Sequence, residues 1–292
     1  MELLLNNFGG FSLVAKGTPW KVKRELGEKD SADYRHQDVQ GGHQQGELEP
    51  ASAHENSERV YGAEVIRVRY IVSVIDSSIQ LNLWKHGLEQ VPEYVWERTE
   101  IESLVLADNG LREISEEIGR LKRLRMLDLG HNQLLQVPEA LGEIDRLSGF
   151  LYLHDNQLAS LPSSLGRLKK LRYLNISENQ FSELPSAVCE MENLAELRVS
   201  DNELVSLPES IGKLSHLREL HLRNNKLTSL PRSVGMLREL RQIDLRGNPL
   251  RDLPQELVTL PRLEKLDLRW VDTFAAPKWL HDLEAHGCLV YL

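Results

Sequence analysis

Residues 217–239 read LRELHLRNNKLTSLPRSVGMLRE and contain two different hydrophobic spacings. Leu220 and Leu222 stand two residues apart, as on one face of a β-strand. Val234 and Leu237 are spaced like one side of a helical turn. An asparagine and a Leu-Pro pair separate the two patterns. The stretch therefore predicts a strand, a turn and a short helix within 23 residues.

This unit recurs along the chain with a period of 23 residues. Prolines keep the step, and Ser115 fills the only vacancy in their series. Asparagines keep it with spacings of 23, 24, 23, 23, 23 and 23, so one unit carries an extra residue, placed between Leu141 and Leu151. We predict that these asparagines are structural; they are Asn109, Asn132, Asn156, Asn179, Asn202, Asn225 and Asn248.

One such unit is too small to bury its leucines, so neighbouring units must stack. Stacking predicts an α/β solenoid over residues 78–292, with about nine units, a concave parallel sheet, short convex helices and a final edge strand. Residues 63–77 alternate β-branched and other residues, which predicts a capping segment. Residues 1–62 are mostly polar without apolar period, so we expect a disordered tail.

The asparagines need hydrogen-bond partners, because a buried amide without them costs roughly 1 to 3 kcal/mol. Backbone groups of an adjacent unit are the available partners in a stack. The series is therefore expected to fail where neighbours run out. His86 and Val271 hold the corresponding places in the first and last units.

The consensus LxxLxLxxNxLxxLPxxIGxLxx resembles that of the leucine-rich repeat family, over about three quarters of the chain. The pairs Leu207-Pro208 and Ile211-Gly212 resemble the cytosolic 23-residue class, which includes Ras-group scaffolds, plant intracellular relatives and bacterial proteins. The resemblance implies a horseshoe-shaped scaffold for intracellular signalling. By family analogy its partner is a small GTPase, a kinase or a phosphatase.

Unit positions 3, 5, 7 and 8 are predicted to point away from the leucine core, onto the concave face. Aromatic side chains gather there in the middle units, and arginines in the later ones, which predicts a protein-binding surface. The arginines have an alternative role, since Asp201, Asp244 and Asp267 are near enough to pair with them across strands. The candidate partner-binding residues are Met126, Phe150, Tyr152, His154, Tyr173, Arg198, His221, Arg223, Arg246 and Arg269.

Composition and motifs exclude several other functions. The net charge of −9 disfavours nucleic-acid binding, and the absence of a long apolar run disfavours membrane insertion. Two cysteines 99 positions apart suit a reducing, cytoplasmic location. Phosphate-binding, HExxH and paired CxxC motifs are missing from the sequence. We expect a non-enzymatic protein that needs no cofactor or metal.

Two other readings stay open. One is a recognition module related to bacterial effector ubiquitin ligases but lacking the catalytic domain. Ligase activity itself is disfavoured, because Cys288 is followed by Leu289 and Val290 and has no acid two residues after it. The other is a structural module whose amino-terminal tail recruits the partner.

Overall fold

The structure is a computed structural model that describes residues 79–271 and 276–292. These residues belong to one compact unit of the chain, Glu58–Leu292. The predicted tail (1–62) and capping segment (63–77) lie outside the described residues.

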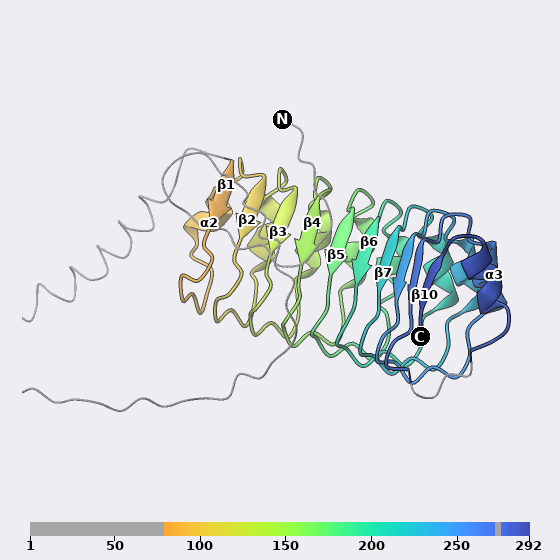
Figure 1. Ribbon diagram of the computed structural model, residues 1–292. Coiled ribbons are helices and arrows are strands. Elements are labelled where there is room, and N and C mark those ends of the chain that lie inside the picture. The colour runs from red at the N-terminus through yellow and green to blue at the C-terminus, as the bar shows by residue number, and fades with distance from the viewer. Residues whose placement is uncertain (1–78, 272–275) are drawn as a thin grey trace, which may run out of the picture. The chain divides into compact units, whose positions relative to one another are not determined.

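Ten short strands form one parallel sheet in which spatial order follows chain order (Figure 1). Each strand contains three residues, and each pairs with the next at an offset of one unit; Phe150 of one strand, for example, lies opposite Tyr173 of the next. The strands are β1 (Gln80–Asn82), β2 (Ser103–Val105), β3 (Met126–Asp128), β4 (Phe150–Tyr152), β5 (Tyr173–Asn175), β6 (Glu196–Arg198), β7 (Glu219–His221), β8 (Gln242–Asp244), β9 (Lys265–Asp267) and β10 (Leu289–Tyr291).

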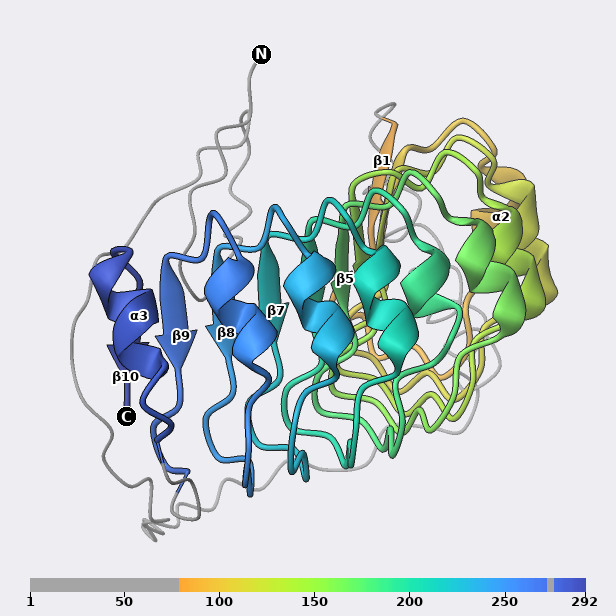
Figure 2. The ribbon, with the colours of Figure 1, turned by 90° about the vertical axis from the view of Figure 1, so that its right-hand side faces the viewer.

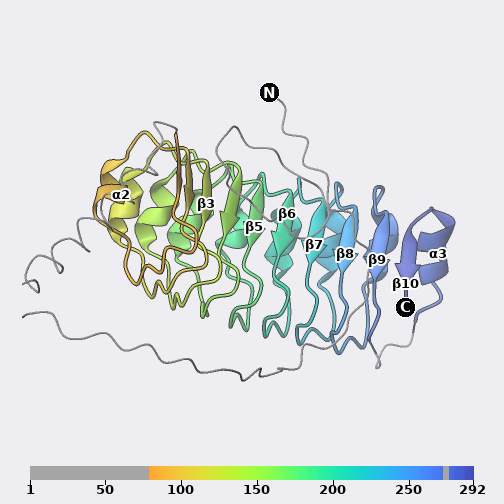
Figure 3. The same cartoon turned by 60° about the vertical axis from the view of Figure 1, so that its left-hand side comes forward.

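The helical segments form a second layer, which lies in front of the strands in Figure 2. Seven of them are 3₁₀ turns: η1 (Glu116–Arg120), η2 (Glu139–Glu143), η3 (Ser163–Arg167), η4 (Val188–Glu190), η5 (Glu209–Lys213), η6 (Arg232–Met236) and η7 (Gln255–Thr259). Among the described residues, the α-helices are α2 (Tyr94–Glu97) in the first unit and α3 (Leu280–Ala285), which lies beside β10 (Figure 3).

The 3₁₀ geometry of these turns is seen in their backbone hydrogen bonds. In η6, the Val234 N–H donates to the Pro231 carbonyl at 3.2 Å, and the Leu237 N–H donates to the Val234 carbonyl at 3.1 Å. Both bonds span three residues, which defines a 3₁₀ turn. The predicted short helices are therefore present in their tighter form.

The leucines of both layers make one continuous core that runs from Leu81 to Cys288. In β1 to β9 the central side chain is buried while its two neighbours lie on the opposite face of the sheet, as in β3, β4 and β5. Trp96 of α2 and Phe181 in the middle units are the bulkiest fully buried side chains. The solenoid prediction is confirmed: the repeated leucines stack into one core, as a unit too small to fold alone requires.

Each asparagine of the series binds the backbone of its own unit and of the unit before it. Asn179 Nδ2 donates to the carbonyls of Ile176 and Ser177 at 3.3 and 3.0 Å, and to that of Leu153 in the preceding unit at 3.0 Å. Its Oδ1 accepts from the Leu158 N–H at 2.9 Å. The amide thus ties two units together at the point where the chain leaves the strand.

The direction of these bonds corrects one part of the sequence analysis. Asn109 and Asn248, like the asparagines between them, reach back to the preceding unit. This direction fits His86, because no earlier unit of the repeat precedes its unit in the sequence. It does not account for Val271, because the unit of Asn248 precedes it.

Candidate partner-binding surface

The outward side chains of the strands, together with those at unit positions 7 and 8, define one surface, which we call the strand face. It lies opposite the helical layer (Figures 1 and 2). Within the described part of the chain, no helix combines the length and apolar character needed to cross a membrane.

The aromatic patch of the strand face comprises Met126, Phe150, Tyr152, His154 and Tyr173. The Phe150 and Tyr152 rings stack with centroids 5.9 Å apart. Tyr173, on the next strand, lies 5.4 Å from Phe150 and 5.0 Å from Tyr152. Met126 lies opposite Phe150 in the sheet register. The sequence-predicted aromatic residues are thus brought into one half-buried cluster whose rings fix one another.

The phenols of this patch stay neutral. Burial raises the pKa of Tyr152 to about 12, and the charges of Asp128 and Glu196 add to the shift. Burial also raises the pKa of Tyr173. Both rings therefore present apolar area and an uncharged hydroxyl on the strand face.

His154 occupies space that Gly130 leaves open. A Cβ on Gly130 would lie 2.4 Å from His154 Cε1, so the absence of a side chain at position 130 makes room for the His154 ring. The His154 ring meets that of His131 edge to face, with centroids 4.6 Å apart, and His131 Nδ1 lies 2.6 Å from Asp155 Oδ2. Burial lowers the pKa of His154 to about 4, so this part of the patch is uncharged near pH 7.

The extra residue of the long unit is Ser148, at the entrance to β4. Leu147 keeps the backbone bond of its equivalents, with its N–H 2.9 Å from the Ile144 carbonyl. One residue later than expected, the Gly149 N–H donates to the Arg125 carbonyl at 2.9 Å. The insertion is therefore absorbed before Phe150, and the register of the sheet is unchanged.

Arg198 and His221 belong to a charged cluster between the aromatic patch and the later arginines. Arg198 Nε donates to Glu196 Oε1 at 2.6 Å. His221 Nε2 lies 3.2 Å from Glu219 Oε2 and 3.8 Å from Glu196 Oε1, and His221 is only 8% exposed. His221, which the sequence analysis predicts as a contact residue, is thus buried beside two carboxylates of the strand face.

Within the described residues, Glu196, Glu219 and His221 form the one group whose ligand atoms lie close enough for a metal ion, within 4.8 Å of one another. Arg198 already supplies a positive charge to Glu196. The two carboxylates therefore lie close both to the guanidinium group of Arg198 and to the imidazole of His221.

Two of the three later arginines pair with aspartates, as the alternative reading proposed, but chiefly within their own strand-and-turn segment. Arg246 binds Asp244 through Nε at 2.9 Å and Nη2 at 2.6 Å. Arg269 binds Asp267 through Nε at 2.9 Å and Nη2 at 2.8 Å. The third predicted acid, Asp201, accepts instead from Asn224 Nδ2 at 2.7 Å.

Asp267 is fully buried beneath this pair of arginines, at 0% exposure. Burial opposes its ionisation, but the hydrogen bonds from Arg269 and the charge of Arg246 outweigh that effect and lower its pKa. Asp267 is therefore an ionised anchor under the strand face, and it holds cations in place.

Trp270, which the sequence analysis missed, stands next to the last arginine. Its side chain is 61% exposed, and the Cζ atoms of Arg223, Arg246 and Arg269 lie 5.5, 5.6 and 5.9 Å from its ring centroid. We call these four residues the tryptophan–arginine cluster. The sequence did contain an indication of Trp270, because unit position 8 is predicted to lie on the concave face. No candidate residue was taken from that position, which holds both Trp270 and His131.

Position 8 also has an unusual backbone. Its residues adopt left-handed conformations, with φ of 53° at His131, 66° at Gly247 and 63° at Trp270. Asparagine, aspartate and glycine tolerate this region, whereas a bulky side chain such as tryptophan is an outlier there. Trp270 is thus both strained and exposed.

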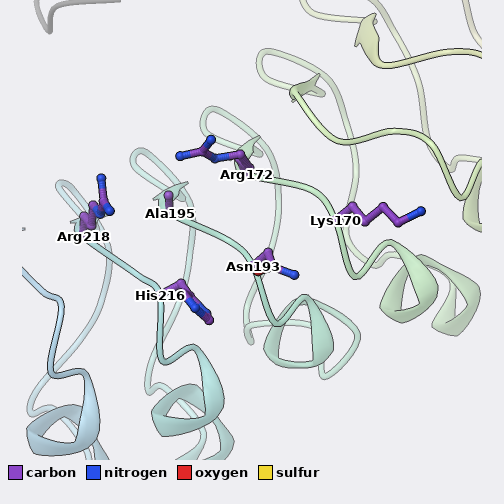
Figure 4. Close-up of a pocket in the computed structure, with 6 residues that line it drawn as sticks. All are labelled: Lys170, Arg172, Asn193, Ala195, His216 and Arg218. Atoms are coloured by element: carbon purple, nitrogen blue, oxygen red, sulfur yellow. The ribbon is translucent and has the colours of Figure 1, made fainter.

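A groove of about 340 Å³ lies where the chain passes from the helical turns into β5, β6 and β7 (Figure 4). It is lined by Lys170, Arg172, Asn193, Ala195, His216 and Arg218. The long side chains fan outward from the groove and do not converge on one point (Figure 4). The basic run that begins at Arg167 thus contributes to a solvated edge.

Comparison with known proteins agrees with the repeated units seen in the fold. A sequence profile described as a leucine-rich repeat region matches residues 146–220 and 203–286. The leucine-rich repeat protein LIC12759 of Leptospira interrogans has a similar structure, with a TM-score of 0.60 and 25% identity over 76% of this chain and 68% of that one. No curated protein matches the sequence significantly.

Two further solved structures are similar. The plant peptide hormone receptor RGFR1, solved in complex with RGF2, has a TM-score of 0.60 and 30% identity over 72% of this chain. The match covers only 34% of the receptor chain. The leucine-rich repeat domain of the type III effector XopL has a TM-score of 0.64, covering 82% of this chain and 84% of that domain; at 20% identity it shows the fold alone. By repeat pattern, fold and sequence match, residues 146–286 form a leucine-rich repeat region, and the described chain has the fold of leucine-rich repeat proteins.

Proposed function

We propose that this protein is a non-enzymatic scaffold that binds a protein partner on its strand face, the face that the sequence predicts to be concave. The observation that carries the proposal is the aromatic patch, where the rings of Phe150, Tyr152 and Tyr173 pack against one another across two strands. Aromatic side chains clustered on one face are typical anchors of protein interfaces. The plant receptor with a similar fold is solved with a bound peptide hormone, which agrees with a peptide or protein ligand here.

The mechanism is rigid display. Each aromatic side chain projects from a strand whose neighbours bond it on both sides. The rings also pack on one another, so few rotamers remain to be lost on binding. Most of the binding free energy gained from ring burial is therefore kept.

The location and partner class rest on family analogy. We infer a cytoplasmic protein of intracellular signalling, with a small GTPase, kinase or phosphatase as partner. The 23-residue consensus and the two widely separated, buried, unpaired cysteines support that location.

Affinity capture from lysate of the source cells tests the location of the binding surface. The bait proteins are the wild-type chain, the double variant Tyr152→Ala with Tyr173→Ala, and a matched control, Leu135→Ala with Met236→Ala. The control removes two exposed apolar side chains elsewhere on the molecule. We expect the tyrosine variant to lose the specific prey and the control to keep it. Equal capture by all three folded proteins would place the binding surface elsewhere.

A further inference from the structure

The tryptophan–arginine cluster gathers three positive charges around one exposed ring. Arg223, Arg246 and Arg269 come from successive units, yet each guanidinium carbon lies within 5.9 Å of the Trp270 ring centroid. Like charges at this spacing repel one another. Their convergence therefore needs compensation from the protein, from a ligand, or from both.

The protein supplies part of that compensation from below. Asp244 and Asp267 are 5% and 0% exposed, and each holds an arginine by two hydrogen bonds. These bonds use Nε and Nη2 of Arg246 and Arg269, while Nη1 takes no part in them. The buried carboxylates thus fix both guanidinium planes and leave donors for a ligand.

The compensation is incomplete. Lys265 adds a fourth cation, 3.7 Å from Asp267, so four positive side chains stand over two carboxylates. Arg223 Nε is buried with no hydrogen-bond partner among the described residues. This local excess of positive charge lies on a chain whose net charge is −9.

Trp270 adds an apolar contact that stability alone does not explain. It keeps most of its side chain in solvent, and it occupies a backbone conformation that disfavours a bulky residue. Strained, exposed positions of this kind are found at binding sites, where the ligand makes use of them. Tyr291 lies beside the cluster, with its ring 5.4 Å from Arg269 Cζ.

We propose that the tryptophan–arginine cluster binds an acidic segment of the protein partner, with carboxylates on Arg223, Arg246 and Arg269 and aliphatic carbons against Trp270. This inference rests on the proposed function and names the chemistry of the partner. Aspartate and glutamate side chains fit because they carry planar carboxylates for the guanidinium groups and methylene groups for the indole face. The segment runs across the strands, since the three arginines are arranged in that direction.

Fluorescence anisotropy with a labelled probe tests the proposal on the full chain. The probe is a fluorescein-labelled peptide of six glutamates flanked by glycines, and its neutral counterpart has six glutamines. The variants are Arg223→Gln and Trp270→Ala, which leave both aspartate pairs intact. The matched control is Arg232→Gln, an exposed arginine of the same unit as Arg223 but on the helical layer. Inorganic phosphate serves as a competitor.

We expect saturable, salt-sensitive binding of the glutamate probe, at least tenfold weaker in Arg223→Gln and in Trp270→Ala, and unchanged in Arg232→Gln. The glutamine probe is expected not to bind. Absence of saturable binding, equal binding of both probes, or an equal loss in Arg232→Gln overturns the proposal. Displacement by phosphate at concentrations too low to act through ionic strength also overturns it, in favour of a phosphate group as the ligand.

A second measurement separates this inference from the proposed function. Arg223→Gln and Trp270→Ala are used as baits beside the tyrosine variant in the lysate capture. Prey lost with the tyrosine variant but retained by both cluster variants leaves the scaffold function standing and overturns the acidic-segment proposal. Prey retained by all three variants overturns the strand face as the binding surface.

Discussion

The aromatic patch and the tryptophan–arginine cluster lie on the same face in different units, yet different interactions hold their side chains in place. In the patch, neutral rings pack on one another, as Tyr152 and Tyr173 do at 5.0 Å. In the cluster, cations are fixed by carboxylates buried beneath them, as Arg269 is by Asp267. The comparison teaches that the repeat determines where a side chain projects, while the neighbouring side chains determine how it is held.

The two regions share one leucine core. The largest effect on stability is expected from a substitution in the core between them. Leu197 of β6 is fully buried between the two regions. Leu197→Ala is expected to cost about 2 to 5 kcal/mol of stability, because it leaves a cavity in the stack. Since each unit contacts only its neighbours, hydrogen exchange should then show the strands β3–β5 and β7–β10 opening separately. Simultaneous opening of both regions would contradict this one-dimensional coupling.

The charged region depends on its buried anion. Asp267→Asn is expected to cost about 3 kcal/mol, since Arg246, Lys265 and Arg269 then share one carboxylate fewer in a buried setting. The matched change in the aromatic region is Asp155→Asn, whose carboxylate is exposed beside His131. We expect a much smaller loss there. Urea denaturation of both variants measures the difference, and equal midpoints would remove the contrast between the regions.

Acid should weaken the aromatic region before the charged one. The His154 pKa falls from 6.5 to about 4 on folding, so between these values the unfolded chain binds more protons and stability falls as pH decreases. Asp267, whose pKa is lowered, loses its contribution only as pH falls below 3.8 through its folded pKa.

The first of these steps can be measured with His154→Gln. Between pH 7 and pH 5 the wild type should lose about 1 kcal/mol more than this variant, after allowance for solvent screening. Urea midpoints of both proteins at the two pH values give the comparison. A pH dependence that survives unchanged in His154→Gln would assign the step to another group.

The smallest effect is expected at Trp270. Trp270→Asn replaces a bulky residue at φ 63° by one that tolerates this conformation, and it loses only exposed contacts with the arginines. The two changes oppose each other, so the stability should stay within about 0.5 kcal/mol of the wild type. A loss of more than about 2 kcal/mol would show that Trp270 stabilises the fold and would weaken the case for binding.

The sequence predicted the solenoid because each leucine repeats the same small environment. Positions such as Leu220 and Leu222 carry the strand signal in every unit, and no long-range guess was needed to place them. The 3₁₀ form of the helical turns was not foreseen, since an apolar spacing of three residues suits both helix types.

The details of the surface were harder to predict. Whether Arg246 pairs with Asp244 or with an acid on the next strand depends on rotamers, which a sequence pattern does not contain. His221 is buried beside Glu196 and Glu219, which come from two different strands, so its burial depends on contacts that the pattern of one unit does not contain. The place of Trp270 on the strand face could have been predicted from the sequence, because unit position 8 repeats as regularly as the others.

The asparagine bonds give the array a polarity that its leucines do not have. Every asparagine amide is hydrogen-bonded to the unit before it, so loss of the last unit leaves every remaining asparagine with its partners. Loss of the first unit instead leaves Asn109 without the Leu83 carbonyl and the Leu88 N–H. The carboxyl end of such an array is where units can be gained or lost during evolution at the lower cost. The amino end is where each loss needs a new residue in place of asparagine, as His86 stands there now.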